Sequence, residues 1–454
     1  MTLLLDCIRW HRCWCGLKKA MLVLVCLLAG PAHALLPIQS WTASSGARVL
    51  LVVNNDLPML DVSVDFPAGS GFDTAGKAGL ASYTNHLMRL GAGGLGENEI
   101  SQRVADIGAS LGSRFDADRA GISVRTLSNV VERDRALEVM TKVLQSPEFP
   151  AEVLAREKAR GIAGLKEADT KPDTIASRTF RQLVFRDHPY GLRSAGEVES
   201  VSALTREDLL DFYRSHYVAD RAVVAIMGDI TREEAQRIAE RLTAGLPRQG
   251  RGIAIKPVAK LERSASAVLP HPASQAHILI GAPGIQRGNP DYFPLFVGNY
   301  ILGGGGFSSR LNEEVRQKRG LAYSVYSFFS PLVEAGVFQV GLQTRGDQAK
   351  GALEVVRNTL NEFVAKGPSE QELDEAKHNL VGGFPMRIDS NAKIHEYLAT
   401  IGFYRLPLTY LDEFVDNVRK VSVADIKAAF SRHVHPDRMV TVVVGGGVEP
   451  TAAP

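Results

Sequence analysis

The sequence predicts an α+β fold of two homologous domains, each built from a mainly antiparallel sheet flanked by helices. The chain has 454 residues, 45% of them hydrophobic, which is too long for one compact core and too apolar for a disordered chain. Short alternating apolar segments, typical of strands, recur in both halves between longer amphipathic segments, typical of helices. The segment ALEVM at 136–140 is echoed by ALEVV at 352–356, which indicates an internal duplication.

The first 34 residues predict a signal peptide. Lys18 and Lys19 precede an apolar run from Met21 to Ala29, and an A-x-A cleavage pattern ends at Ala34. We therefore expect an exported, periplasmic protein that is cleaved near Ala34. All four cysteines fall in this leader, so the mature protein would contain none, which excludes thiol catalysis and a cysteine zinc site.

The charge balance argues against nucleic acid as a partner. The leader carries a net charge of +3, so the formal +2 of the whole chain becomes about −1 after cleavage. The apolar run in the leader is too short to cross a bilayer, and no later stretch approaches ~20 apolar residues. We therefore expect no membrane span.

The first domain is expected over residues 35–245. Val49–Val53 and Leu60–Phe66 flank a turn and are predicted to pair as antiparallel strands. A buried strand over 221–228 is predicted to close this domain. Between them we expect helices over 78–90, 97–107, 128–146 (opened by Ser128) and 151–168, and strands over 110–116 and 121–126.

A loose stretch over 246–270, in which glycine and proline fall among charges, is predicted to be the linker to a second domain at 271–454. This domain repeats the pattern of the first, with helices between short apolar segments. We expect in it a strand opening at 277–281, a helix ending at Leu302, a helix with a capping box from Ser369 to Glu372, and a final buried strand at 439–444.

The stretch from Asn299 to Ser330 concentrates the strongest local signals. Four consecutive glycines, Gly303–Gly306, permit positive φ or close approach of a neighbour. Ser308 or Ser309 is expected to cap a helix with acids in its first turn and bases in its last, which ends at Gly320. The glycine run is open to two interpretations, close helix packing or the shaping of a binding-site edge.

Arg316 lies in the last turn of this predicted helix, where a cation suits the helix dipole. Leu321, Tyr323 and Val325 then alternate with smaller or polar residues, as in a half-buried strand. Arg316 and Tyr323 are therefore expected to flank one helix-to-strand corner.

Four motifs carry a family resemblance. They are GLASYTNHLMRLG at 79–91, HPYG at 188–191, LGGGGFSSRL at 302–311 and VRQKRGLAYSVYS at 315–327. They resemble the pitrilysin/insulysin metallopeptidases, a family that includes the mitochondrial processing peptidase and the cytochrome bc1 core subunits. The resemblance covers essentially the whole mature chain, and implies two homologous α+β domains that, with two more, form a chamber around an extended peptide.

The resemblance also implies where a zinc site would lie. The family's inverted motif, H-x-x-E-H, places two histidine ligands and a general base on one helix face. The matching positions here are Ser82, Asn85 and His86. Of two family glutamates seven residues apart, Glu157 matches the first, whereas Gly164 stands at the metal-ligand position. Asparagine cannot act as a general base and one imidazole does not hold zinc, so we expect no metal and no cofactor in this chain.

A second histidine-containing segment offers an alternative cluster. His433 and His435 lie two residues apart and are followed by Asp437. A solvated helix end next to proline explains this pair equally well, so we assign no metal-binding residues.

The substrate-binding pair of the family is retained. In the family, an arginine and a tyrosine seven residues apart contact the substrate backbone beside the zinc, and these match Arg316 and Tyr323. A phenol can donate to the oxyanion that forms at the scissile carbonyl, and a guanidinium can hold a peptide carbonyl by forked donation. An extended peptide could also add to an exposed strand edge.

These features predict a non-zinc subunit of a periplasmic pitrilysin-type peptidase. It would form a heterodimer with a homologous, zinc-bearing subunit, be inactive without that partner, and supply Arg316 and Tyr323 to the hydrolysis of extended peptides. Two alternatives remain open. One is a stand-alone zinc metalloendopeptidase with unusual ligands that include His86, and the other is a non-catalytic peptide-binding or assembly subunit.

Overall fold

The computed structural model describes residues 37–248, 250 and 254–446. The predicted signal peptide, residues 1–34, lies outside the described residues. The chain divides into residues 1–37 and a compact unit of residues 38–454, which contains all the helices and strands described. In the described part of the chain, no helix is long and apolar enough to cross a membrane.

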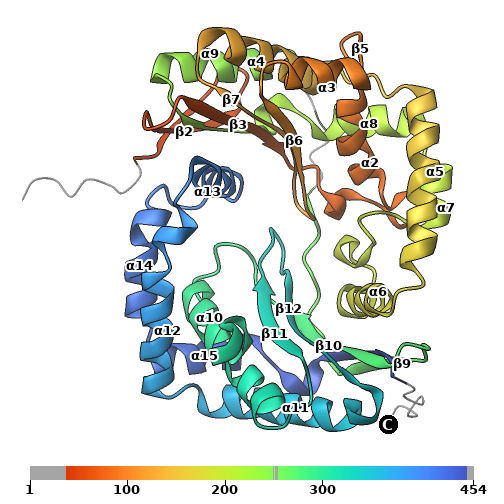
Figure 1. Cartoon of the computed structure of the whole chain (residues 1–454), viewed down its shortest axis with the longest axis vertical. Coiled ribbons are helices and arrows are strands. Elements are labelled where there is room, and N and C mark those ends of the chain that lie inside the picture. Colours follow the sequence, from red (N-terminus) through yellow and green to blue (C-terminus); the bar gives the residue numbers. More distant parts are fainter. Residues whose placement is uncertain (1–36, 249, 251–253, 447–454) are drawn as a thin grey trace, which may run out of the picture. The chain divides into compact units, whose positions relative to one another are not determined.

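The first half of the chain forms a six-stranded sheet of order β1-β2-β8-β3-β7-β6 (Figure 1). All neighbours in this sheet are antiparallel except β2 and β8, which run parallel. A short hairpin pairs two further strands, β4 and β5. The strands are β1 (Gln39–Thr42), β2 (Arg48–Val53), β3 (Met59–Phe66), β4 (Gly91–Ala92), β5 (Leu95–Gly96), β6 (Ser110–Phe115), β7 (Ala120–Leu127) and β8 (Val223–Gly228).

The predicted pairing of Val49–Val53 with Leu60–Phe66 is wrong. Strand β8 lies between β2 and β3, parallel to the first and antiparallel to the second. Every residue of β8 (VVAIMG) is buried, and so continuous an apolar run is typical of a central strand that is covered on both faces. A strand from late in this half therefore takes the central position.

Eight helices of the first half are described, and one of them, α5, has the predicted bounds. The helix predicted to open at Ser128 begins one residue later, because Asn129 is its N-cap and accepts hydrogen bonds from the N–H groups of Val131 and Glu132. The helices are α2 (Leu80–Leu87), α3 (Glu97–Ala105), α4 (Val130–Gln145), α5 (Ala151–Ala168), α6 (Pro172–Phe185), α7 (Val198–Ala203), α8 (Arg206–His216) and α9 (Arg232–Thr243).

The second half forms a five-stranded sheet of order β11-β12-β10-β13-β9. Its neighbours are antiparallel except β13 and β9, and β9 falls inside the predicted linker. The capping box from Ser369 to Glu372 is confirmed. The elements are β9 (Ala265–Leu269), β10 (Gln275–Pro283), α10 (Tyr292–Asn299), β11 (Ser324–Ser330), β12 (Val337–Arg345), α11 (Ala349–Lys366), α12 (Glu370–Gly382), α13 (Asn391–Phe403), α14 (Tyr410–Lys420), α15 (Val423–His433) and β13 (Val440–Gly445).

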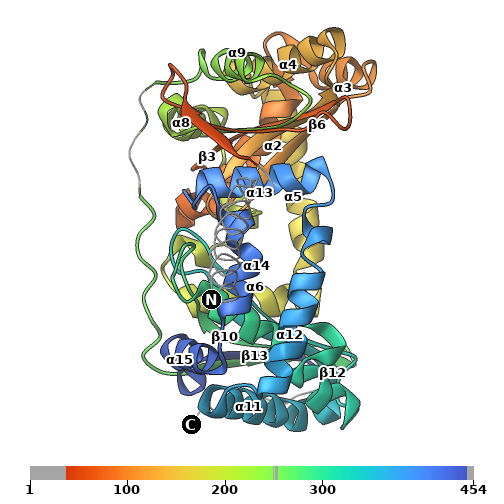
Figure 2. The same cartoon turned by 90° about the vertical axis from the view of Figure 1, so that its left-hand side faces the viewer.

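The two halves exchange helices. α6, from the first half, packs against β10 and β13, whereas α13, from the second half, packs against β2, β3 and β8. Figures 1 and 2 both show α13 lying along the first sheet. Ala176, Phe180 and Val184, spaced four residues apart on α6, join a buried cluster that includes Leu279 and alternate valines of β13 (Val440, Val442 and Val444). Two sheets flanked by helices confirm the predicted α+β class, and each sheet is completed by the other half.

Candidate functional site

The helix-to-strand corner brings Arg316 and Tyr323 together. The guanidinium carbon of Arg316 lies 5.0 Å from the centre of the Tyr323 ring and 4.7 Å from that of Phe307. Both aromatic side chains are exposed, Tyr323 to 81% and Phe307 to 68%. A cation between two exposed rings is held in place by cation–π attraction, which fixes the direction of the guanidinium without consuming its N–H donors.

The local backbone of this corner differs from the prediction. Residues Asn312–Gln317 wind as a π-helix, in which the N–H of Lys318 donates to the carbonyl of Glu313 at 2.9 Å. Neither serine caps it, because Ser308 Oγ donates to the carbonyl of Gly305 and Ser309 Oγ to that of Gly306. Single π-turns are rare and are frequently found at functional sites.

Tyr323 also lies on the opposite side from the one predicted. Strand β11 begins at Ser324, so Tyr323 precedes the pleat and does not share the buried face of Val325. Its phenol therefore points into solvent instead of packing in the core.

The glycine run serves close packing at one position and turning at another. A Cβ on Gly303 would lie 2.4 Å from Ser327 Oγ and 2.7 Å from the backbone nitrogen of Ser327, so glycine lets this segment rest directly on β11. Gly306 has φ of +62°, which L side chains rarely adopt. This turn presents Phe307 to Arg316.

Arg316 forms no ion pair with any carboxylate that the structure describes, because the nearby glutamate pairs with other basic residues. Glu314 accepts from Lys318 Nζ at 2.7 Å and from Arg319 at 2.6 Å. These hydrogen bonds lower the pKa of Glu314 below its usual value. Within residues 37–248, 250 and 254–446, no ion pair to Arg316 is present. Its N–H donors are therefore available to a bound peptide carbonyl.

The helix that matches the zinc motif has different partners. Asn85 is buried, and its amide donates to the carbonyl of Gly121 at 3.2 Å and to Tyr217 Oη at 3.4 Å. His86 Nε2 lies 3.2 Å from Glu157 Oε2 on α5. Burial acts to raise the pKa of Glu157, but hydrogen bonds from Arg156 and His86 outweigh it and hold the pKa below its usual value.

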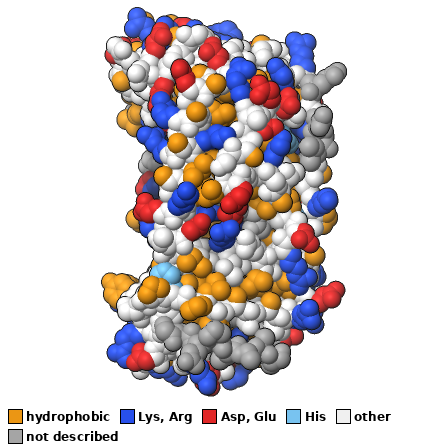
Figure 3. Space-filling view, turned by 90° about the vertical axis from the view of Figure 1, so that its right-hand side faces the viewer, with side chains coloured by type: hydrophobic (Ala, Val, Ile, Leu, Met, Phe, Trp, Pro, Cys, Tyr) orange, Lys and Arg blue, Asp and Glu red, His pale blue; other side chains and the backbone are white. Residues whose placement is uncertain are grey.

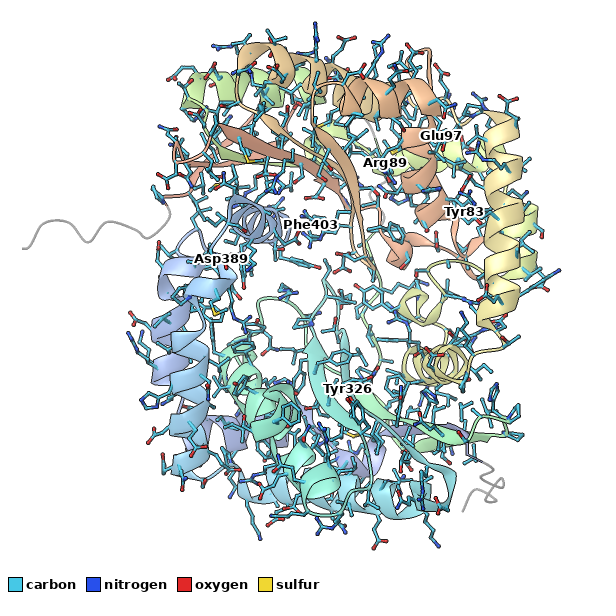
Figure 4. The ribbon with its side chains drawn as sticks, viewed as in Figure 1. Tyr83, Arg89, Glu97, Tyr326, Asp389 and Phe403 are labelled. Atoms are coloured by element: carbon cyan, nitrogen blue, oxygen red, sulfur yellow. The ribbon has the colours of Figure 1, made fainter. Side chains whose placement is uncertain are left out.

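The neighbouring helix α5 carries two glycines of different character. A Cβ on Gly161 would fall 1.8 Å from the hydroxyl of Tyr83, a side chain that points from α2 toward α5 (Figure 4). At Gly164, the position of the family's metal ligand, an added Cβ would meet nothing within 4 Å. The structure therefore has room for a metal-binding side chain at position 164, but glycine does not supply one.

These residues do not fit a zinc ion. Of the described residues, only His86 and Glu157 offer ligand atoms at this place, and they are hydrogen-bonded to each other. In the alternative cluster, His433 is engaged too, because its Nε2 lies 2.8 Å from Asp291, which also accepts from Arg432. Among the residues whose placement is described, no group of three or more His, Cys, Asp or Glu side chains could hold a metal ion.

Two features were missed by sequence reasoning. One is Phe307, the second aromatic ring on Arg316, for which its position inside the glycine motif was the available signal. The other is Asp118, a fully buried carboxylate that accepts from Tyr190 of the HPYG motif, from Tyr404 Oη at 2.8 Å and from the N–H of Val333 at 2.7 Å. Burial raises the pKa of Asp118 despite these hydrogen bonds. No local signal marks it, because its partners lie far away in the sequence.

The surface shows no single-sign charge field on the face in Figure 3. Basic and acidic side chains are interspersed over its upper and middle parts, and hydrophobic side chains gather lower down. On this face, the described residues therefore lack the basic patch that nucleic-acid binding requires.

Comparison with known proteins finds relatives over nearly the whole described chain. Residues 48–197 match the family described as Insulinase (Peptidase family M16), and residues 203–380 match the Peptidase M16 inactive domain. The solved structure of a peptidase M16 inactive domain from Pseudomonas fluorescens is 37% identical, with a TM-score of 0.87, over 91% of this chain and 100% of that one. The periplasmic protease PqqL of Escherichia coli shares the fold, with a TM-score of 0.76 at 18% identity, over 90% of this chain and 45% of that one.

Two curated relatives carry contrasting names. The "Non-peptidase homolog YmxG" of Helicobacter pylori is 26% identical over 400 residues, which are 87% of this chain and 91% of the relative. An "Uncharacterized zinc protease" of Streptomyces coelicolor is 24% identical over 422 residues, 91% of this chain and 90% of the relative.

Proposed function

Because the chain belongs to the M16 (insulinase) family of peptidases, we propose that it is the non-zinc subunit of a periplasmic, heterodimeric peptidase. One observation carries the proposal: Tyr323 is exposed and Arg316, half-buried between two aromatic rings, has no ion-pair partner among the described residues, whereas the zinc-motif positions hold a buried asparagine and a hydrogen-bonded histidine–glutamate pair. A chain that had merely lost an ancestral activity would have no reason to keep the substrate-binding pair accessible while losing the zinc motif.

The names of the relatives support an auxiliary role. A relative called a non-peptidase homologue and another called an inactive domain are both similar to this chain over most of its length. By analogy, this chain would not hydrolyse peptides alone. Its partner would be a homologous subunit that bears the complete zinc motif.

In the composite site, this chain's residues bind and polarise the substrate. The Tyr323 hydroxyl donates to the oxyanion of the tetrahedral intermediate, and the Arg316 guanidinium, aligned by Phe307, holds a neighbouring peptide carbonyl. The attacking water and its activation are left to the zinc-bearing partner. Exposure of Tyr323 in the isolated chain is then expected, because the partner would cover it.

The test uses the mature chain, the zinc-bearing homologue and their mixture. Peptide hydrolysis should appear in the mixture and be absent from this chain alone. Tyr323→Phe should lower turnover by roughly 10²-fold, the usual cost of losing one oxyanion donor. Tyr326→Phe, which removes a phenol hydroxyl from a half-exposed tyrosine three residues further on, in β11 (Figure 4), is the matched control and should not alter turnover.

Two results would replace the proposal by an alternative. Full hydrolysis by the isolated chain with stoichiometric zinc, lost in His86→Ala, would establish a stand-alone peptidase. Unchanged turnover in Tyr323→Phe and Arg316→Ala, with the mixture still active, would establish a peptide-binding or assembly subunit.

A further inference from the structure

Helix α6 presents a polar face to a cavity that the proposed chemistry does not use. The cavity has a volume of about 500 Å³ and is lined by α6, by the loop over 191–194, by the end of β6 and by the end of β11. Its size is that of a small-molecule or peptide side-chain site. Ala176, Phe180 and Val184 hold the opposite face of α6 against the second sheet, so the polar face is fixed in direction.

Three arginines line this cavity, and they differ in their partners. Arg178 and Arg193 both pair with Asp169 and Glu197, with shortest distances of 2.9 Å and 2.8 Å respectively. Arg181 instead donates to the carbonyl of Tyr190 at 2.6 Å and lies over the ring of Phe185. In the described part of the chain, no carboxylate lies within ion-pair distance of Arg181.

The environment of Arg181 is that of an uncompensated cation. Burial lowers its pKa, with no nearby carboxylate acting to raise it. A partly desolvated guanidinium without a counter-ion favours an anionic ligand, and its planar fork matches a carboxylate in bidentate geometry. The hydroxyl of Ser177, one helical turn before Arg181 on the same face, adds a further donor at the cavity wall.

The position of the cavity indicates what kind of anion would enter it. Phe115 ends β6 and Ser330 ends β11, and both strands lie at the edges of their sheets. An extended peptide added along either edge would run into the cavity. Two carboxylates also line the cavity: Asp116 is paired with Arg119 at 2.9 Å, and Asp173 lies eight residues before Arg181, about 12 Å along the helix axis, so neither neutralises Arg181.

We propose that this cavity binds a carboxylate of an extended peptide at Arg181, either the free C-terminal carboxylate or an acidic side chain. The proposal rests on the proposed function, because it names the substrate class of the same peptide-binding chain. The carboxylate would lie toward Arg181 and away from Asp173. Peptides with an acidic group near one end would then be preferred.

Binding of matched fluorescent peptides to the mature chain tests this site. Tyr323 directly precedes β11 and Ser330 ends it at the cavity, so the two lie about 23 Å apart at ~3.3 Å per residue, and peptides of roughly eight residues span this distance. They carry either a free or an amidated C-terminus, combined with either Glu or Gln near that end. The two single-carboxylate peptides identify which source is bound, and the doubly neutral peptide measures binding without a carboxylate.

The decisive variant is Arg181→Gln. It should weaken binding of the preferred carboxylate peptide by roughly ten- to a hundredfold, and binding of the neutral peptide by less than about twofold. Arg181→Lys keeps the positive charge but not the forked guanidinium, so its affinity for the carboxylate peptide should lie between those of the wild type and Arg181→Gln. Arg135→Gln, which removes an exposed cation on α4, is the matched control and should change neither. Circular dichroism establishes that each variant is folded.

Each outcome supports or overturns the proposal. Equal wild-type binding of neutral and carboxylate peptides, or an equal loss for both in Arg181→Gln, overturns the carboxylate site and leaves the proposed function standing. Absence of binding for every peptide overturns the carboxylate site, and turnover of the mixture with the zinc-bearing subunit decides the proposed function separately. A carboxylate preference that depends on Arg181, together with unchanged turnover in Tyr323→Phe, would retain the site and overturn the composite active site.

Discussion

The corner at Arg316 and the helix pair α2–α5 differ in how their polar groups are partnered. At the corner, Tyr323 is 81% exposed and Arg316 is held only by aromatic rings. On α2 and α5, Asn85 is buried with two hydrogen-bond partners and Glu157, 5% exposed, is bonded to His86 and Arg156. The corner therefore has hydrogen-bond donors that are free to bind a ligand, whereas the polar groups of the helix pair are hydrogen-bonded to one another. Solvated donors can exchange water for a ligand, whereas the donors of a buried, hydrogen-bonded network are already engaged in holding the structure.

The largest difference is expected in activity. In the complex with a zinc-bearing partner, Arg316→Ala should lower turnover by roughly 10²-fold, because an oriented donor to the substrate is lost. His86→Ala, which removes a half-exposed side chain from the helix pair, should change turnover by less than about twofold. Comparable losses in both variants, with unchanged melting temperatures, would remove the functional distinction between the two regions.

The next effect concerns acid stability of the α2 region. His216 lies on α8, which packs on α2, and its burial between Phe72 and Phe212 lowers its pKa to about 4. The unfolded chain takes up this proton near pH 6.5 but the folded chain only near pH 4, so the free energy of unfolding should decrease as pH falls between these values. The loss is at most about 3 kcal/mol. Urea unfolding across this range should give a flatter pH dependence in His216→Phe; an identical slope would contradict the assignment.

The smallest effects separate two glycines on the same helix. Gly161→Ala should destabilise the chain by about 1–3 kcal/mol, because the new methyl group collides with the Tyr83 hydroxyl. Gly164→Ala should stabilise it by about 0.5–1 kcal/mol, since the site is open and alanine favours the helix. Chemical denaturation of the pair measures both signs. Destabilisation by Gly164→Ala would show that glycine is structurally required there.

The sequence predicted where the strands and helices lie along the chain better than it predicted which of them pack side by side. Periodicity located the strands at 49–53, 60–66 and 221–228, but it cannot say that the last inserts between the first two, because sheet order depends on long-range burial. The exchange of α6 and α13 escaped prediction for the same reason, as amphipathic spacing shows that a helix has a buried face but not which sheet covers it.

At the corner, the sequence predicted that Arg316 and Tyr323 lie together, because they are seven residues apart and match a family motif. It did not predict the exposure of Tyr323, because an alternating pattern favours an inward tyrosine, and only the start of β11 at Ser324 decides the matter. It also missed Phe307, whose contact with Arg316 depends on the turn at Gly306.

The exchange of α6 and α13 has a consequence for the integrity of the chain. A cut in the segment between α9 and β9 would leave each fragment lacking the helix that covers its own sheet and holding the helix that covers the other's. Neither fragment can bury its apolar sheet face alone, so the two would stay associated and behave as complementing fragments. Limited proteolysis there would nick the polypeptide without separating it, and either half expressed by itself would be insoluble.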